Sequence, residues 1–260
     1  MREIEPRSIL IDKILKAYQL HSEEVAETVE LYYDAQKLRL IHANKERTEG
    51  PDELVSWFAR WLILGESVIA GKLRDWVEQG DSPPESKWAY EQYGIGPVLA
   101  AGLAAHIDVT KADSISAVWK FAGQAPGFDK RLKGQKLPYN SRLKVLCWKI
   151  GESFVKVSGK EEAVYGQLYA KFKAEEIARN ASGHYAAAAR EQLASKKFRD
   201  NPTRKLLEAG KLSDAYLHAR AKRRAVKIFL SHYWTVGRQA RGLAIREPYA
   251  IAVLGHDGKL

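Results

Sequence analysis

The chain has one cysteine, Cys147, among its 260 residues. A single cysteine excludes an intrachain disulfide framework and a zinc site built from several cysteines. No run of eighteen apolar residues occurs, and Met1 is followed by Arg2, Glu3 and Glu5 rather than by a basic patch and a long apolar stretch. We therefore expect a cytoplasmic protein without a signal peptide or a membrane role.

Alternating β-branched runs bracketed by hairpin turns are also missing. Apolar residues instead recur three and four positions apart along most of the chain, which is the period of an amphipathic helix. With 45% hydrophobic and 10% aromatic residues, the chain has enough apolar material to bury a core. These patterns predict an all-α fold.

Acidic residues are scarce in the second part of the chain. The whole chain carries 42 Lys and Arg against 32 Asp and Glu, a formal net charge of +10. Residues 1–80 and 81–118 are net acidic, whereas residues 119–160 hold 10 basic and 2 acidic groups and residues 161–260 hold 19 and 10. A positive excess confined to one part favours a polyanionic partner, and a merely solvated basic surface is the alternative.

Two long helical patterns precede a pair of prolines. The first spans about residues 8–45, with a break where Ser22 is expected to cap a new helix. The second follows residues 50–52 and reaches about Gln79. Its expected apolar face consists of Phe58, Trp61, Leu62, Gly65, Ile69, Leu73 and Trp76. The short turn between them predicts an antiparallel helical hairpin arm over residues 1–80, for which a coiled-coil dimerisation role is the functional alternative.

A Gly-x-Gly turn follows the prolines. The segment 88–103 predicts two short helices around Gly94, Ile95 and Gly96, with both glycines able to take positive φ and Ile95 filling the gap between the helices. Such a turn exposes backbone N–H groups and the positive end of a helix, a geometry that binds phosphate. The pattern resembles the helix-hairpin-helix motif of non-sequence-specific DNA-binding proteins, and a tight turn without a ligand is the alternative.

A basic loop with Lys130, Arg131, Lys133 and Lys136 comes next, and its glycines and prolines predict an exposed segment. The elements that carry a family resemblance are Gly94–Pro97, Trp119–Pro126, this loop and Ser141–Lys144. Together they resemble the C-terminal domain of the DEDD-class transposases and pilin-inversion recombinases. Residues 139–260 are also similar to short phage-associated proteins labelled transposase-like.

The resemblance covers about residues 1–155 and implies that the arm corresponds to the family's helical linker. The family's RuvC-like nuclease domain has no counterpart in this sequence, so we expect no four-acid nuclease site. The family's catalytic serine lies in the loop after the Ala-Pro motif, but residues 127–136 contain no serine. Ser141, the one candidate left, starts a helix, where its hydroxyl is expected to cap backbone N–H groups rather than to attack a phosphodiester.

Two basic helices extend the predicted interface. The helix over about residues 140–157 places Cys147 in an apolar core stripe and Arg142, Lys149 and Lys156 on a flank. A helix from about Ser213 gathers seven residues within one third of its circumference. They are Arg220, Arg223, Arg224, Lys227, Trp234, Arg238 and Arg241. Like charges four residues apart repel, and either a polyanion or the acidic arm can relieve that repulsion.

The histidines have no ligand-like spacing, so we expect no metal and no cofactor. The sequence predicts an arm over residues 1–80, a helix-hairpin-helix region over 81–125 and a basic helical region over 126–260. We expect a non-catalytic protein that binds duplex or branched DNA largely independently of sequence and is nucleoid-associated when bound, with RNA as the alternative polyanion. Two other functions stay open: a minimal recombinase whose nuclease is supplied in trans, and a helical scaffold that forms a homodimer through residues 8–80.

Overall fold

The computed structural model describes residues 18–127, 133–195 and 199–245. These residues form ten α-helices and one short 3-10 helix, with no strand among them, so the predicted all-α fold is confirmed. The chain divides into two compact units. One consists of the residues up to Glu91 together with Gly96–Asp108, and the other of Gln92–Ile95 and the residues from Val109 onward.

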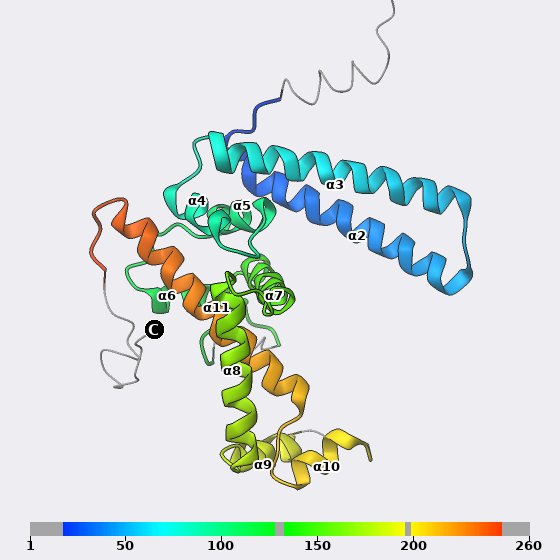
Figure 1. Cartoon of the computed structure of the whole chain (residues 1–260), viewed down its shortest axis with the longest axis vertical. Coiled ribbons are helices and arrows are strands. Elements are labelled where there is room, and N and C mark those ends of the chain that lie inside the picture. Colours follow the sequence, from blue (N-terminus) through cyan, green and yellow to red (C-terminus); the bar gives the residue numbers. More distant parts are fainter. Residues whose placement is uncertain (1–17, 128–132, 196–198, 246–260) are drawn as a thin grey trace, which may run out of the picture. The chain divides into compact units, whose positions relative to one another are not determined.

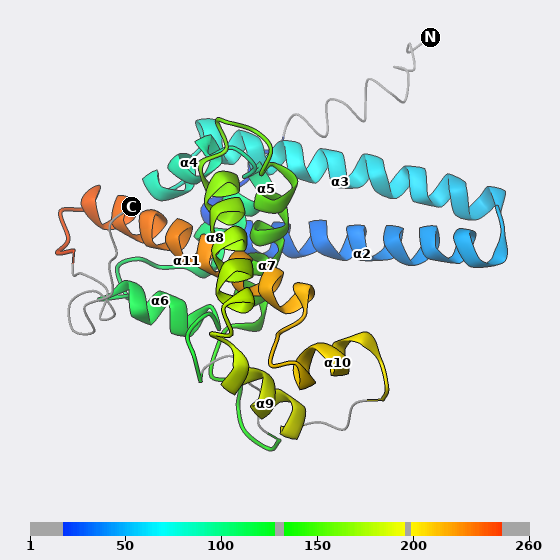
Figure 2. The same ribbon diagram turned by 60° about the horizontal axis from the view of Figure 1, so that its bottom comes forward.

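The first unit contains the predicted helical hairpin, in which two long antiparallel helices lie side by side (Figures 1 and 2). α2 spans Val25–Glu49 and α3 spans Glu53–Gln79. Gly50 ends α2 with a φ of 99°, a backbone conformation that favours glycine. The Asp52 carboxylate then caps α3 by accepting a hydrogen bond from the backbone N–H of Val55 at 2.9 Å.

The break predicted near Ser22 is present, but Ser22 is not the cap. The chain enters α2 through a single 3-10 turn, η1, at Ser22–Glu24. The Glu24 carboxylate accepts a hydrogen bond from the backbone N–H of His21 at 3.0 Å. The Ser22 hydroxyl instead lies 3.4 Å from the indole nitrogen of Trp76, and this contact joins η1 to the end of α3.

The face that α3 turns toward α2 differs from the predicted one. Leu62, Leu73 and Trp76 are buried as expected, but Trp61 is 58% exposed. Trp61 faces solvent because the seam follows Leu62 and Glu66, about a quarter-turn around the helix from it. Glu66 accepts from Arg39 of α2 at 2.6 and 3.1 Å, a bidentate ion pair inside the seam.

Two short helices complete the first unit. α4 spans Pro84–Glu91 and α5 spans Pro97–His106, which packs against α2, α3 and α4. The hydroxyl of Ser86 donates a hydrogen bond to the carbonyl of Ala100 at 3.0 Å, which ties α4 to α5. Because α4 belongs to the same unit as α3, the predicted boundary near Pro84 lies inside this unit.

In the described part of the chain, α3 is also the one helix long and apolar enough to span a membrane by length and composition. Core helices of soluble proteins also meet this criterion of length and apolar composition. The expected cytoplasmic location stays a prediction.

The second unit is centred on two long antiparallel helices, α8 (Val164–Ala181) and α11 (Asp214–Gln239), visible in Figure 1. α7 (Ser141–Lys156) packs on both. Their common core is aromatic, because the ring centroids of Phe154, Tyr165 and Phe229 lie 5.0 to 5.5 Å apart. The helices predicted near residues 140–157 and from residue 213 are therefore confirmed.

Three shorter helices lie around this pair. α6 spans Ile115–Phe121 and packs on α11. α9 spans Ala186–Ser195 and α10 spans Pro202–Glu208. They pack on each other around a small core of Tyr185, Ala189, Leu207, Leu212 and Leu217, the last of which belongs to α11. α10 was not predicted from the sequence, although Asn201 caps it by accepting a hydrogen bond from the N–H of Arg204 and Pro202 is its first residue.

Candidate nucleic-acid interface

The connection between α6 and α7 is fixed by backbone hydrogen bonds. α6 ends in a Schellman motif, in which Gly123 takes a φ of 63°, its N–H donates to the carbonyl of Lys120 and the N–H of Gln124 donates to that of Trp119. After the loop, the N–H of Asn140 donates to the carbonyl of Phe121 at 2.8 Å. The start of α7 and the end of α6 are thereby held together.

Ser141 does not cap α7 as predicted. Asn140 occupies the cap position, and its side-chain oxygen accepts a hydrogen bond from the backbone N–H of Leu143 at 3.0 Å. Ser141 is the first helical residue, is exposed and makes no side-chain hydrogen bond to any described residue. No base therefore contacts it, and catalysis by Ser141 gains no support.

The Gly-x-Gly turn has one strained glycine rather than two. Gly94 takes a φ of 93°, but Gly96 is extended, with a φ of −85°, and serves as the N-cap of α5. Both glycines were expected to permit a positive φ, and of the two Gly94 alone adopts one. Ile95 is buried, and the carbonyl of Gly94 accepts a hydrogen bond from the hydroxyl of Ser153 on α7.

The two glycines therefore face different surroundings. A Cβ on Gly94 would lie 3.1 Å from Val157, whereas a Cβ on Gly96 would meet nothing within 4 Å. The space beside the Cα of Gly96 is open, as a bound phosphate would require. The space beside the Cα of Gly94 is filled by side chains from α7 and its C-terminal end. Phosphate binding at this turn stays a prediction.

The predicted basic loop is described only in part. Lys130 and Arg131 lie outside the described residues, while Lys133 and Lys136 are exposed. On α7, Arg142 and Lys156 are exposed, but Lys149 is half-buried, and burial lowers the pKa of its ammonium group. Among the predicted contact residues that the structure describes in this region, Lys133, Lys136, Arg142 and Lys156 are therefore the exposed cations.

Cys147 is a core residue, as predicted. Its side chain is buried in α7, and burial raises the pKa of its thiol to about 12. The thiol stays protonated near neutral pH, which excludes a role as a thiolate nucleophile.

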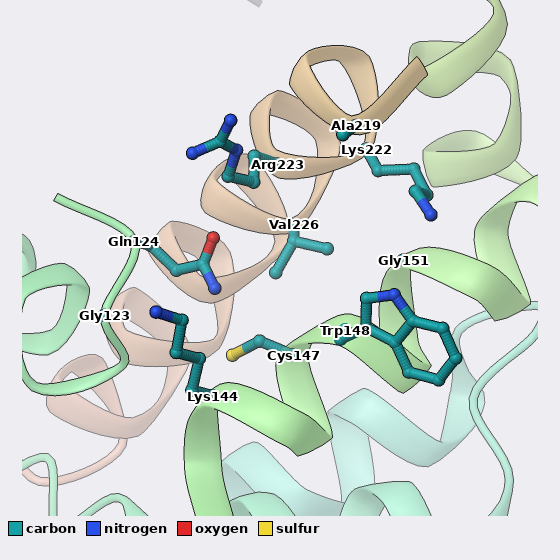
Figure 3. Close-up of a pocket in the computed structure, with 10 residues that line it drawn as sticks. All are labelled: Gly123, Gln124, Lys144, Cys147, Trp148, Gly151, Ala219, Lys222, Arg223 and Val226. Carbon is teal, nitrogen blue, oxygen red and sulfur yellow. The ribbon is translucent and has the colours of Figure 1, made fainter. Parts of the chain in front are cut away.

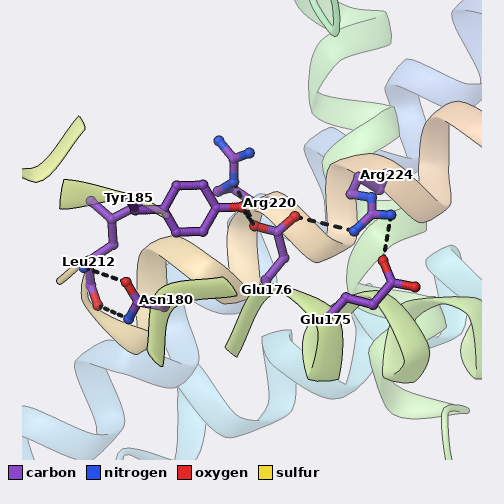
Figure 4. Close-up of polar contacts among 7 residues, drawn as sticks. All are labelled: Glu175, Glu176, Asn180, Tyr185, Leu212, Arg220 and Arg224. Atoms are coloured by element: carbon purple, nitrogen blue, oxygen red, sulfur yellow. Dashed lines mark hydrogen bonds and ion pairs between the residues drawn. The ribbon is translucent and has the colours of Figure 1, made fainter. Parts of the chain in front are cut away.

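Two of the six arginine and lysine residues on the predicted basic flank of α11 are bound in an internal network (Figure 4). Arg220 donates to Glu176 of α8 at 2.8 Å, and Arg224 pairs with Glu176 at 3.3 Å and with Glu175 at 2.7 Å. The hydroxyl of Tyr185 donates to the same Glu176 carboxylate at 2.5 Å. Acidic residues of α8 thus relieve the repulsion at Arg220 and Arg224, a source that differs from both alternatives raised by the sequence, a polyanion and the acidic arm.

Glu176 is charged although its side chain is fully buried. Burial opposes ionisation, but the hydrogen bonds from Tyr185 and Arg220 and the charges of Arg220 and Arg224 outweigh it. The pKa of Glu176 therefore lies below its ordinary value. This network is structural.

The other members of the predicted basic face are divided as well. Lys227 makes a cation–π contact with Trp119, with its ammonium nitrogen 4.0 Å from the ring centroid. Burial is the larger cause that lowers the pKa of Lys227, and the positive charge of Arg223 is the smaller one. Trp234 and Arg238, predicted on the same flank, are buried. Arg238 donates to the carbonyls of Val109 and Ala112, so its charge fastens the 109–112 segment to α11.

Arg223 has a different position, because it lines a cavity between α7, α11 and the connection after α6 (Figure 3). The cavity measures about 230 Å³. Its lining residues are Gly123, Gln124, Lys144, Cys147, Trp148, Gly151, Ala219, Lys222, Arg223 and Val226. Sequence reasoning did not single out Gln124, Lys144, Trp148 or Lys222. Trp148 could have indicated this site from the sequence, because it is a large aromatic residue that lies outside the apolar stripe of its helix.

The histidines of α11 have tyrosine partners. Nδ1 of His218 lies 2.7 Å from the hydroxyl of Tyr169, and Nδ1 of His232 lies 2.7 Å from that of Tyr165. Burial lowers the pKa of both imidazoles. Among the residues that the structure describes, no group of three His, Cys, Asp or Glu side chains is placed to hold a metal ion.

No protein-family model, curated protein or solved structure matches this chain. The resemblance to the DEDD-class transposases therefore stays a prediction that depends on the sequence motifs alone.

Proposed function

We propose that this protein binds nucleic acid, with DNA as the favoured partner. Binding is largely independent of sequence, and the protein has no catalytic site of its own. The observation that carries the proposal is the charge of residues 119–260, which hold 29 basic and 12 acidic groups. Even if every one of those acids pairs with a cation, 17 positive charges remain in this part of the chain. Internal ion pairs such as the Glu176 network cannot absorb that excess, and a phosphate backbone can.

The geometry narrows the contacts to fewer residues than the sequence suggested. Arg220 and Arg224 form ion pairs with α8 inside the protein. We therefore assign the contacts with the phosphate backbone of the nucleic acid to the remaining cations. These are the exposed Lys133, Lys136 and Lys156 together with Arg142 and Arg223. Gly96 is retained as a phosphate contact because the space around its Cα is open. Contacts to phosphate position a protein without reading sequence, which fits the proposed lack of sequence preference.

The test compares two variants of equal net charge. Replacing Lys136 and Lys156 by Gln removes two exposed cations from the proposed interface, and replacing Lys37 and Lys45 by Gln removes two exposed cations from α2. Binding to duplex DNA is measured by fluorescence anisotropy over a range of salt concentrations. We expect the parent affinity to fall steeply with salt, and the interface variant to lose about 1–2 units of the log–log slope while the α2 variant keeps it. Equal slopes in both variants, or no binding at low salt, contradict the proposal.

A second candidate function is favoured by an apolar stripe on α3. Leu54, Trp57, Trp61 and Leu64 are each more than half exposed, and their spacing of three, four and three residues is that of a coiled-coil seam. Large exposed apolar patches mark interaction sites. This stripe supports a homodimer formed through the arm, which is compatible with nucleic-acid binding by the other unit. The recombinase alternative has no comparable support from Ser141, whose side chain makes no hydrogen bond to a general base in the described part of the chain.

A further inference from the structure

The cavity of Figure 3 lies entirely within the second unit and has an apolar floor. Cys147 and Gly151 of α7 and Val226 of α11 form that floor, and all three are buried. Its volume of about 230 Å³ is below the roughly 300–1,000 Å³ of pockets for drug-sized ligands. A cavity of this size suits one aromatic group rather than an extended ligand.

The walls add positive charge. Lys144 projects from α7, and Lys222 and Arg223 project from α11 on the opposite side. The ten described residues that line the cavity include these three cations and no acid. Lys222 pairs with Glu152 just outside the lining, so the surroundings keep a positive excess. The ligand is therefore expected to be an anion.

Trp148 supplies an aromatic wall. Its side chain is 60% exposed, whereas the neighbouring Cys147, which also lines the cavity, is buried. The ammonium group of Lys222 lies 5.9 Å from the centre of its ring. An exposed indole beside a cation is a platform on which a nucleobase stacks, with the phosphate held by the neighbouring charge.

Gln124 supplies an unsatisfied acceptor. Its side-chain oxygen Oε1 is buried without a hydrogen-bond partner, while its amide nitrogen donates to the carbonyl of Ala122 at 3.5 Å. The Schellman motif at Gly123 fixes the backbone of Gln124 at the cavity edge. A buried acceptor without a partner is costly, so a ligand with an N–H group fits it. Every nucleobase has an N–H group on its Watson–Crick edge, and that edge is accessible only in an unpaired strand.

We propose that this cavity holds one unstacked nucleotide of an unpaired nucleic-acid strand. The base stacks on Trp148 and donates a hydrogen bond to Gln124, and its phosphate lies among Lys144, Lys222 and Arg223. This inference depends on the proposed function and deepens it, because it adds a site for unpaired nucleotides to a surface for duplex backbone. Single-stranded DNA and RNA share this chemistry, and separate probes distinguish them.

The experiment measures the affinity of the full chain for three probes of one sequence: single-stranded DNA, single-stranded RNA and blunt duplex DNA. Trp148→Ala removes the stacking wall at an exposed position and is expected to weaken single-strand binding by roughly 5- to 150-fold, with duplex binding changed by less than about twofold. The matched control is Tyr216→Ala, which removes an exposed aromatic residue of α11 outside the cavity and is expected to change neither.

A second variant distinguishes a loss of binding from a loss of folding. Gln124→Leu keeps the side-chain volume and removes the unpaired acceptor, so its thermal midpoint is expected to be unchanged or higher while single-strand binding weakens. Single-strand binding equal to that of the parent in both variants overturns the inference, and so does an equal weakening for single strands and duplex. Duplex binding by the parent then leaves the proposed function intact, whereas a parent that binds no probe at low salt overturns both.

Discussion

Glu176 is ionised at a position that water does not reach. Its carboxylate has three partners: Tyr185, which directly precedes α9, and Arg220 and Arg224, which both lie on α11. Burying a charge is tolerated only when hydrogen bonds and opposite charges replace the lost water. Removing this one charge therefore leaves two arginines facing a neutral group.

Glu176→Gln is expected to lower the free energy of unfolding by about 2–3 kcal/mol, measured by urea denaturation. A fully buried pair would cost roughly 3–5 kcal/mol, and the value is reduced here because the Arg220 and Arg224 side chains are 36% and 33% exposed. The control Glu175→Gln breaks a half-exposed pair and is expected to cost less than about 1 kcal/mol. Equal costs for the two variants contradict the buried network.

The pH dependence of the same variant follows from the lowered pKa of Glu176. The folded state keeps Glu176 ionised at pH values where the unfolded chain takes up a proton. Its stabilisation is fully present above the ordinary value of 4.5 and is lost as the pH falls through the lower folded value. The stability difference between parent and Glu176→Gln is therefore expected to shrink over that acidic range, and a constant difference would contradict the network.

At the scale of elements, the start of α7 depends on one hydrogen bond. The side chain of Asn140 satisfies the N–H of Leu143, whereas Ser141 satisfies none. Asn140→Ala is expected to cost about 1 kcal/mol of stability, and Ser141→Ala less than about 0.5 kcal/mol. Urea denaturation of both variants checks the ranking, and a larger loss for Ser141→Ala would show that the cap is assigned to the wrong residue.

At the scale of the whole molecule, the stripe on α3 predicts self-association. Leu54, Trp57, Trp61 and Leu64 are exposed at coiled-coil spacing, so two chains can bury them against each other. Sedimentation equilibrium of the full chain is expected to give twice the mass of one chain, and Trp57→Glu with Trp61→Glu is expected to return it to one. Exposed positions keep the fold of the variant intact, which circular dichroism verifies. A monomeric parent at micromolar concentration would remove the dimer proposal.

The all-α class could be predicted from the amino-acid sequence, together with the helical hairpin and the positions of α7 and α11. Ser213 marked the start of α11, where its side chain accepts a hydrogen bond from the N–H of Tyr216, because capping is a local property of the chain. The hairpin of α2 and α3 followed for the same reason, since a turn of three residues joins two long periodic segments. The start of α10 has a local signal as well, since Asn201 caps it and Pro202 is its first residue, but this signal was missed.

Which of the charged side chains face solvent depends, in contrast, on how distant segments pack against one another. Helical periodicity places Arg220, Arg223 and Arg224 on one flank, but α8 brings Glu175 and Glu176 against two of them and leaves Arg223 on a cavity wall. Gln124 and Trp148 lie on different segments, and their meeting at one cavity depends on how α6, α7 and α11 pack. Periodicity assigns a residue to a face of its own helix, whereas the partner that covers that face comes from a distant part of the chain.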